Sequence, residues 1–118
     1  NDKFVQEVAL AYCLQDKDVN CFWAQVAQYH TFFPDQPFPR YVQEAMLLFH
    51  DELKTGPEDI SIYNIDPDIR QRYQSFIANL KANAQNGMSV DQIGAALQAR
   101  FGDTYWWDYC VIKDIPMY

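Results

Sequence analysis

The chain has 118 residues, of which 16 are acidic and 9 basic, and its formal net charge is −7. With 49% hydrophobic residues, it is long enough to bury one core without metals or disulfides. The acidic balance argues against nucleic-acid binding, which needs clustered Lys and Arg, and against docking on an anionic membrane. No apolar run approaches the roughly 20 residues that span a bilayer, so we expect no membrane insertion by this segment.

The first two helices are expected over residues 2–15 and 19–32. In the first, helical spacing predicts a buried stripe of Val5, Val8, Ala9 and Tyr12. In the second, it predicts a buried stripe of Phe22, Val26, Tyr29 and Phe33, widened by Trp23. The polar turn 16–18 is so short that the two helices must form an antiparallel hairpin.

Pro34, Pro37 and Pro39 end the second helix, because proline lacks the backbone donor that a helix interior needs. A third helix is expected over residues 40–54 and is closed by Gly56 and Pro57. Its predicted buried residues are Tyr41, Ala45, Leu48 and Phe49. Residues 57–65 are expected to form a loop that Ile60 and Ile62 attach to the core.

A fourth helix over residues 67–85 starts with the N-cap Asp66 and the first-turn Pro67. Its predicted buried stripe is Ile69, Tyr73, Phe76, Ile77, Leu80 and Ala84. A fifth helix over residues 90–101 starts with a capping box of Ser89 and Gln92 and stops at Gly102. It is expected to bury Ile93, Leu97 and Phe101.

The aromatic segment 103–112 (DTYWWDYCVI) has two interpretations. It forms either a short sixth helix capped by Asp103 or a strand, and we favour the helix. Tyr105, Trp106, Trp107 and Tyr109 cannot all point inward from one helix, so some are expected to be exposed or to line a groove. The alternative, which we favour, is that this segment caps an open end of the helical stack.

A six-residue pattern recurs: residues 5–10 (VQEVAL) return as residues 42–47 (VQEAML), 37 positions later. Each copy continues into an aromatic residue, Tyr12 or Phe49. A period of this length, with each copy opening an amphipathic helix, is typical of stacked helical hairpins. The sequence therefore predicts an all-α fold of five or six helices in antiparallel hairpins, a short helical-repeat stack.

The chain has three cysteines and no C-x-x-C pair, so zinc and thioredoxin-type sites lack their ligand spacing. Cys13 and Cys21 could form a disulfide across the predicted hairpin. The favoured interpretation is that both, together with Cys110, are small buried apolar residues.

No residue pattern indicates catalysis, a metal or a cofactor. His50 is followed by Asp51 and Glu52, but successive helical positions point about 100° apart, so the three cannot bind one ion. A Cys–His pair of Cys13 or Cys21 with His30 has no support from the spacing, and no G-x-S-x-G motif or phosphate-binding glycine loop exists. The acidic residues between positions 51 and 68 are expected to be solvated surface rather than a site for a basic partner.

Two resemblances follow from these motifs. The hairpin pattern resembles tetratricopeptide-like repeats. Residues 11–14 (AYCL), 39–48 (PRYVQEAMLL) and 101–107 (FGDTYWW) resemble the soluble C-terminal part of a family of uncharacterised multi-spanning membrane proteins from Bacteroidetes. This second resemblance implies a helical domain at the end of a larger protein, and it supplies no catalytic or binding residues. We therefore expect residues 1–118 to be a single domain and a fragment of a longer protein.

The leading hypothesis is a non-enzymatic interaction or accessory domain of a larger, envelope-associated bacterial protein, with a protein or peptide as its partner. Candidate anchors are Tyr41, Trp106, Trp107 and Tyr109, because Trp and Tyr are common in binding hot spots. The alternative is a small-ligand or carbohydrate-binding domain in which the C-terminal aromatic cluster stacks on the ligand.

Overall fold

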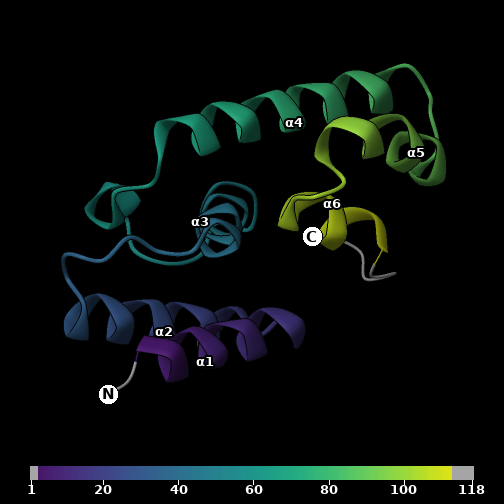
Figure 1. Ribbon diagram of the computed structural model, residues 1–118. Helices are drawn as coiled ribbons and strands as arrows, with labels where there is room; N and C mark the ends of the chain where they lie inside the picture. Colours follow the sequence, from purple (N-terminus) through teal and green to yellow (C-terminus); the bar gives the residue numbers. More distant parts are fainter. Residues whose placement is uncertain (1–2, 113–118) are drawn as a thin grey trace. The chain divides into compact units, whose positions relative to one another are not determined.

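In a computed structural model of the chain, the structure describes residues 3–112, with side chains up to residue 110. This part is all-α and contains no strand, which confirms the predicted fold class. Its α-helices are α1 (Lys3–Gln15), α2 (Val19–Phe32), α3 (Arg40–Leu47), α4 (Pro67–Gln85), α5 (Val90–Phe101) and α6 (Tyr105–Trp107) (Figure 1). The chain divides into two compact units, residues 1–65 and 66–118, which are described separately below. None of the described helices is long and apolar enough to cross a membrane.

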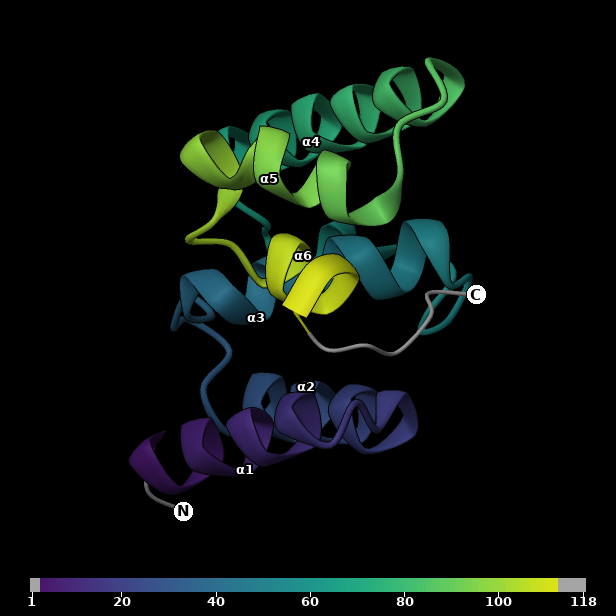
Figure 2. The ribbon, with the colours of Figure 1, turned by 90° about the vertical axis from the view of Figure 1, so that its right-hand side faces the viewer.

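The first unit is built on the hairpin of α1 and α2, which lie side by side in each view (Figures 1 and 2). Asp18 caps α2, because its side chain accepts a hydrogen bond from the backbone N–H of Cys21 at 3.0 Å. Phe22, Val26 and Tyr29 of α2 are fully buried, as the helical spacing predicts. The hairpin is thus confirmed, and the predicted inward side of α2 is confirmed in part, because Trp23 and Phe33 are half-buried and Phe33 lies just beyond the helix.

The predicted inward side of α1 is wrong. Val5, Val8 and Tyr12 are 56%, 37% and 65% exposed, and Ala9 is half-buried. The buried residues of this helix are instead Gln6, Leu10, Cys13 and Leu14. Both sets have helical spacing, so periodicity alone could not choose between them. The covalent bond from Cys13 to α2 holds the second set, which includes Leu10 and Leu14, toward the core.

Cys13 and Cys21 form a disulfide, with their Cα atoms 5.6 Å apart. The favoured interpretation of all three cysteines as unlinked buried residues is therefore wrong for this pair. The turn between α1 and α2 brings the two residues together, and Lys17 in this turn has a left-handed φ of 53°. Cys110 is half-buried and is not part of this bond.

The third helix changes its geometry before its predicted end at residue 54. After α3 the chain forms a π-helical turn, η1 (Leu48–Glu52), in which the N–H of Leu53 donates to the carbonyl of Leu48 at 3.3 Å. Leu48 and Phe49 are both fully buried in this turn. The predicted helix 40–54 is therefore corrected to an α-helix followed by one π turn.

The loop after η1 is attached to α2 through Trp23. The indole Nε1–H of Trp23 donates to the Thr55 hydroxyl at 3.0 Å, and that hydroxyl donates to the Phe49 carbonyl at 2.7 Å. Gly56 has a φ of 85°, and any side chain at this position would overlap the Trp23 ring. Glycine is needed here for both reasons.

Residues 57–65 contain a short 3-10 helix, η2 (Ile60–Tyr63), which corrects the predicted loop. Asp59 caps it by accepting from the Ser61 N–H at 2.9 Å, and this bond lowers the pKa of the Asp59 carboxyl. Ile60 is buried but Ile62 is 54% exposed, so only one of the two predicted attachment residues reaches the core. A 3-10 helix has three residues per turn, which places residues two apart on different sides.

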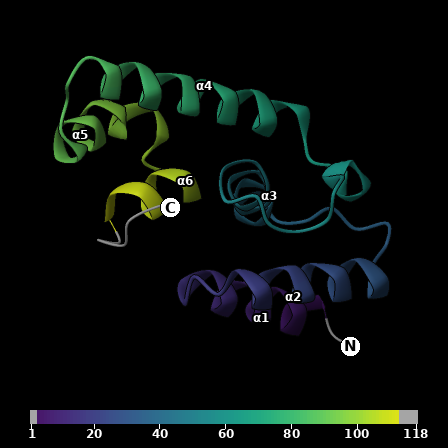
Figure 3. The same cartoon turned by 180° about the vertical axis from the view of Figure 1, so that it is seen from behind.

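The second unit begins with the hairpin of α4 and α5, which also lie side by side (Figure 3). Asp66 caps α4, and Ser89 and Gln92 form the predicted capping box of α5. The residues of this hairpin that are buried are Tyr73, Phe76, Ile93, Gly94, Leu97 and Phe101. Ala84 is exposed, and Ile69, Ile77 and Leu80 are half-buried, so the predicted stripe on α4 is buried only in part.

The aromatic tail is helical, not extended. It consists of α6 and the π turn η3 (Asp108–Ile112). Its cap is Thr104, whose hydroxyl accepts from the Trp107 N–H at 3.2 Å, and not the predicted Asp103. Asp103 instead forms an ion pair with Arg72 of α4 at 2.8 Å.

Candidate interaction surface

Three of the predicted anchors lie in the core of the second unit. Trp106 is fully buried, and Trp107 and Tyr109 are 8% and 7% exposed. The Trp106 ring packs against Tyr73 and Phe76, with centroid distances of 5.3 and 5.8 Å. These side chains attach the tail to α4, and they offer little ring surface to a ligand.

The polar group of Trp107 is also satisfied inside the second unit. Its indole Nε1–H donates to the Gly94 carbonyl of α5 at 2.9 Å. Tyr105 and Tyr109 pack against each other with a centroid distance of 5.9 Å. Burial, and then the neighbouring Tyr109 and Asp108, raise the pKa of Tyr105.

Tyr41, the fourth predicted anchor, belongs to the first unit and is half-buried. Its hydroxyl donates to the backbone carbonyl of Glu7 at 3.4 Å, so it joins α3 to α1. Burial, and then the charge of Glu7, raise the pKa of the Tyr41 hydroxyl. Tyr41 therefore contributes a contact within the first unit.

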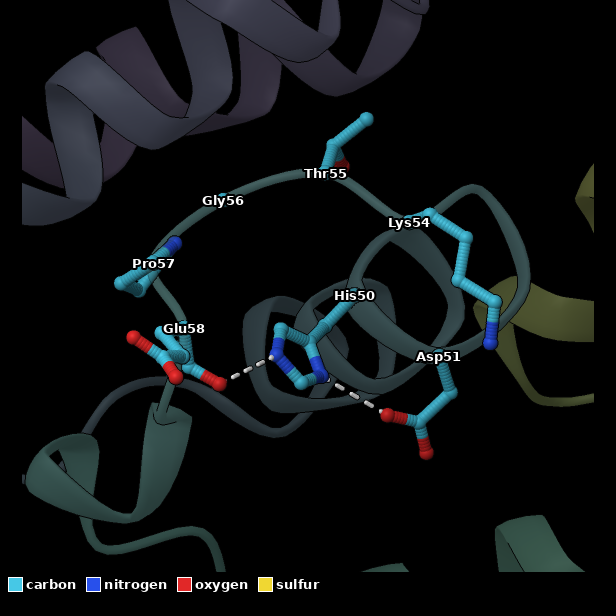
Figure 4. Close-up of a pocket in the computed structure, with 7 residues that line it drawn as sticks. All are labelled: His50, Asp51, Lys54, Thr55, Gly56, Pro57 and Glu58. Atoms are coloured by element: carbon cyan, nitrogen blue, oxygen red, sulfur yellow. Dashed lines mark hydrogen bonds and ion pairs between the residues drawn. The ribbon is translucent and has the colours of Figure 1, made fainter.

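A shallow pocket of about 350 Å³ surrounds His50 (Figure 4). It is lined by His50, Asp51, Lys54, Thr55, Gly56, Pro57 and Glu58. The His50 ring lies between the Asp51 carboxylate, 2.8 Å from Nδ1, and the Glu58 carbonyl, 3.2 Å from Nε2. Both partners are acceptors, so only a doubly protonated ring donates to both.

These contacts connect the end of the helix to the following loop, because each ring nitrogen of His50 has an acceptor within hydrogen-bond distance. In the described part of the chain, no group of three or more His, Cys, Asp or Glu side chains could hold a metal ion. Cys13 and Cys21 are bonded to each other, so neither is available as a thiol nucleophile for His30. His30 instead contacts the Tyr63 ring edge-on, with centroids 5.3 Å apart.

An exposed apolar stripe on α1 was not predicted as a site. Phe4, Val5, Val8 and Tyr12 are 68%, 56%, 37% and 65% exposed. Steps of three and four residues place them on one side of the helix, opposite the stripe that contains Leu10 and Cys13. α1 therefore has apolar residues both toward its own core and toward solvent.

The adjoining outer side of α2 is also uncharged. Its exposed residues include Asn20, Ala24, Ala27, Gln28 and Thr31. The two helices have 13 and 14 residues, and Lys3 and Glu7 are their only Asp, Glu, Lys or Arg residues. We name this outer side of the hairpin the hairpin face, and define it as Phe4, Val5, Val8, Ala11 and Tyr12 of α1 with Asn20, Ala24, Ala27, Gln28 and Thr31 of α2.

Two sequence signals could have revealed the hairpin face. The first helix contains two apolar stripes, whereas an amphipathic helix on a protein surface needs one. The absence of Asp, Glu, Lys and Arg from residues 19–32 is a second signal, because exposed helix sides are normally charged.

A family described as a family of unknown function (DUF6057) matches residues 1–112. No curated protein and no solved structure matches the chain. The evidence for function is therefore the geometry of the two units.

Proposed function

The chain belongs to this family of unknown function, DUF6057, and we propose that it is a non-enzymatic interaction domain whose hairpin face binds a protein partner. The observation that supports this proposal is the row of exposed apolar side chains along α1, among them Val5, Val8 and Tyr12. Contiguous exposed apolar surface is characteristic of binding sites on soluble domains.

The composition of the hairpin face supports a protein as the partner. The centre of a protein–protein interface is depleted in charged residues and enriched in aromatic ones. The hairpin face has no charged member and includes the aromatic residues Phe4 and Tyr12. Extended helical surfaces of this kind match the apolar side of another helix.

A catalytic role has less support, because the hydrogen bonds of His50 occupy both ring nitrogens and two of the three cysteines form a disulfide. Carbohydrate binding by the aromatic tail has less support as well, because Trp106 and Trp107 are buried. The sequence resemblance supplies the wider context of the proposal, an accessory domain of a larger, membrane-anchored bacterial protein with tetratricopeptide-like hairpins.

The test is cross-linking and affinity purification of the intact protein from its native cells, with mass spectrometry as the readout. Three forms are compared: wild type, Val8→Glu on the hairpin face and Val90→Glu on α5. Val90 is 66% exposed and outside the hairpin face, so its substitution is the matched control. Circular dichroism first establishes that both variants keep the helical content of the wild type.

We expect wild type and Val90→Glu to capture the same protein, and Val8→Glu to lose it. Cross-links should include Lys3 or Lys17, the lysines at the two ends of α1. If Val8→Glu captures the same proteins as the wild type at the same level, the hairpin face is not the binding surface. Cross-links confined to lysines in the second unit would have the same meaning.

A further inference from the structure

We infer that the bond between Cys13 and Cys21 forms by exchange with a disulfide in an oxidising compartment, outside the reducing cytosol, and that this domain works there. The inference goes beyond the proposed function, because it concerns the turn between α1 and α2 and not the hairpin face. Disulfides persist in oxidising compartments, whereas glutathione and thioredoxin systems keep cytosolic thiols reduced. The support comes from the local geometry of the turn, from the small share of α1 that is buried, and from the different burial of the two cysteines.

The turn positions the two cysteines through bonds between residues close in the chain. The N–H of Asp18 donates to the Cys13 carbonyl at 2.9 Å, and the N–H of Lys17 donates to the Leu14 carbonyl at 3.1 Å. With the left-handed φ of Lys17, these two bonds form a Schellman cap at the end of α1. Asp18 also caps α2 through the N–H of Cys21. Local bonds therefore fix the backbone around both cysteines, at a Cα–Cα distance of 5.6 Å that suits a disulfide.

The bond compensates for the small number of core residues in α1. Of the 13 residues of this helix, the buried ones are Gln6, Leu10, Cys13 and Leu14. The first unit, residues 1–65, is of a size at which a hydrophobic core alone gives marginal stability. A covalent link to α2 restricts the unfolded chain and so favours the packed hairpin. A bond with this structural role needs a compartment in which it persists.

The different burial of the two cysteines sets the order of the reaction. Cys13 is 3% exposed, whereas Cys21 is half-buried. An oxidant must reach a thiol before the thiol can attack it, so Cys21 reacts first. The Cys21 thiolate attacks one sulfur of the oxidant and forms a mixed disulfide, and the other sulfur of the oxidant leaves as a thiolate.

The second step closes the bond within the chain. The Cys13 thiolate attacks the Cys21 sulfur of the mixed disulfide and displaces the remaining sulfur of the oxidant. The two cysteines together lose two electrons and two protons, and the oxidant takes them up as it is reduced to two thiols. The co-reactant is therefore a disulfide, and oxidised glutathione serves as the probe for it below.

The experiment traps the thiol state of the chain in its native cells. The cells are quenched with acid, and the protein is denatured in N-ethylmaleimide, purified, digested with trypsin and read by mass spectrometry. Cleavage after Lys17 separates the two cysteines, so an intact bond joins the peptides 4–17 and 18–40. Cys110 is outside this bond and lies in the peptide 101–113, so it is the internal control for alkylation. We expect the joined pair of peptides together with alkylated Cys110.

A second arm relates the bond to the compartment. The same 118-residue chain is produced in a laboratory bacterium in two forms, one retained in the reducing cytosol and one with a cleavable export signal. We expect the exported form to contain the bond, and the cytosolic form to have Cys13 and Cys21 both alkylated. Alkylation of both cysteines in the protein from native cells would overturn the inference. A bond of equal extent in the cytosolic form would also overturn it, because the pair would then form without an oxidising compartment.

Single variants test the order of attack. Cys13→Ser and Cys21→Ser are each combined with Cys110→Ser, so that one thiol remains, and circular dichroism first establishes that both keep the same helical content. On incubation with oxidised glutathione under native conditions, Cys21 should gain one glutathione at least about tenfold faster than Cys13, because the buried thiol is shielded. The mass of the intact chain measures both rates. Equal rates would overturn the assignment of Cys21 as the residue that reacts first.

Discussion

α1 and α3 contain the same local pattern in different surroundings. All six residues of the second copy, Val42 to Leu47, are buried in α3. Of the first copy, residues 5–10 of α1, only Gln6 and Leu10 are buried. Two near-identical segments therefore form helices in both places, but their burial differs. Local sequence determines the helix, and the tertiary surroundings determine which of its sides are covered.

The two copies agree at the positions that face the core in both. Leu10 and Leu47 are fully buried, and Gln6 and Gln43 are 3% and 7% exposed. They differ at the valine position, where Val5 is 56% exposed and Val42 is fully buried. Substitutions at matched positions can therefore be compared by their effect on the free energy of unfolding. We expect equal effects where both residues are buried, and a larger effect in α3 where only the residue in α3 is buried.

The largest effect is expected at the leucines. Leu10→Ala and Leu47→Ala should each lower the free energy of unfolding by about 2–5 kcal/mol, because each leaves a cavity at a fully buried site. Urea denaturation followed by circular dichroism measures both values. If Leu10→Ala cost less than about 1 kcal/mol while Leu47→Ala unfolded the protein, α1 would not be part of the core.

The disulfide distinguishes α1 from α3 in a different way. Cys13 and Cys21 are eight residues apart, and closing a loop of that length stabilises a folded chain by about 2.5 kcal/mol. Reduction, or the double variant Cys13→Ala/Cys21→Ala, should lower the free energy of unfolding by about that amount. A reductant should have no further effect on the double variant, which serves as the control. Equal stability with and without reductant in the wild type would contradict the disulfide.

The valine pair tests the difference between the copies directly. Val42→Ala should cost about 2 kcal/mol, because the side chain is fully buried. Val5→Ala should change the free energy of unfolding by less than about 0.5 kcal/mol in the monomer. Both substitutions remove the same atoms, so each is the control for the other. Equal costs would mean that the exposed side of α1 is covered in solution, and measurement at several protein concentrations would then reveal whether self-association covers it.

Predictions from the sequence were correct for features that depend on neighbouring residues and less so for features that depend on contacts between helices. Helix starts with side-chain caps, such as Asp66 and Ser89, were predicted correctly, because a cap is a contact between residues close in the chain. The sidedness of α1 could not be predicted, since two stripes of similar spacing compete and contacts with α2 decide between them. The π turn after α3 was missed, although the burial of Leu48 and Phe49 in it was predicted correctly.

The candidate site was less predictable than the fold. Aromatic residues were selected as anchors because of their type, but Trp106 is a core residue of the second unit. The hairpin face was instead hidden among residues predicted to be buried, including Val5 and Tyr12. An apolar residue at helical spacing is compatible with a core and with an interface, and one sequence does not distinguish the two.

The smallest expected effect concerns Tyr41, which joins the two helices of this comparison. Its hydroxyl donates to the Glu7 carbonyl at 3.4 Å, so Tyr41→Phe should cost at most about 1 kcal/mol at neutral pH. Tyr12→Phe is the matched control, because Tyr12 is 65% exposed. It should leave the free energy of unfolding unchanged.

Tyr41 also makes the stability of the protein depend on pH. Burial, and then Glu7, raise the pKa of Tyr41 above the ordinary value of 10.0. Above pH 10 the unfolded chain therefore loses this proton before the folded chain does. The contribution of Tyr41 is complete below about pH 10 and is lost as the pH rises through the folded value. Between pH 9 and pH 11, the stability of Tyr41→Phe should accordingly fall less steeply than that of the wild type. Equal slopes would mean that the Tyr41 hydroxyl is solvated, and that α3 holds α1 through apolar contacts alone.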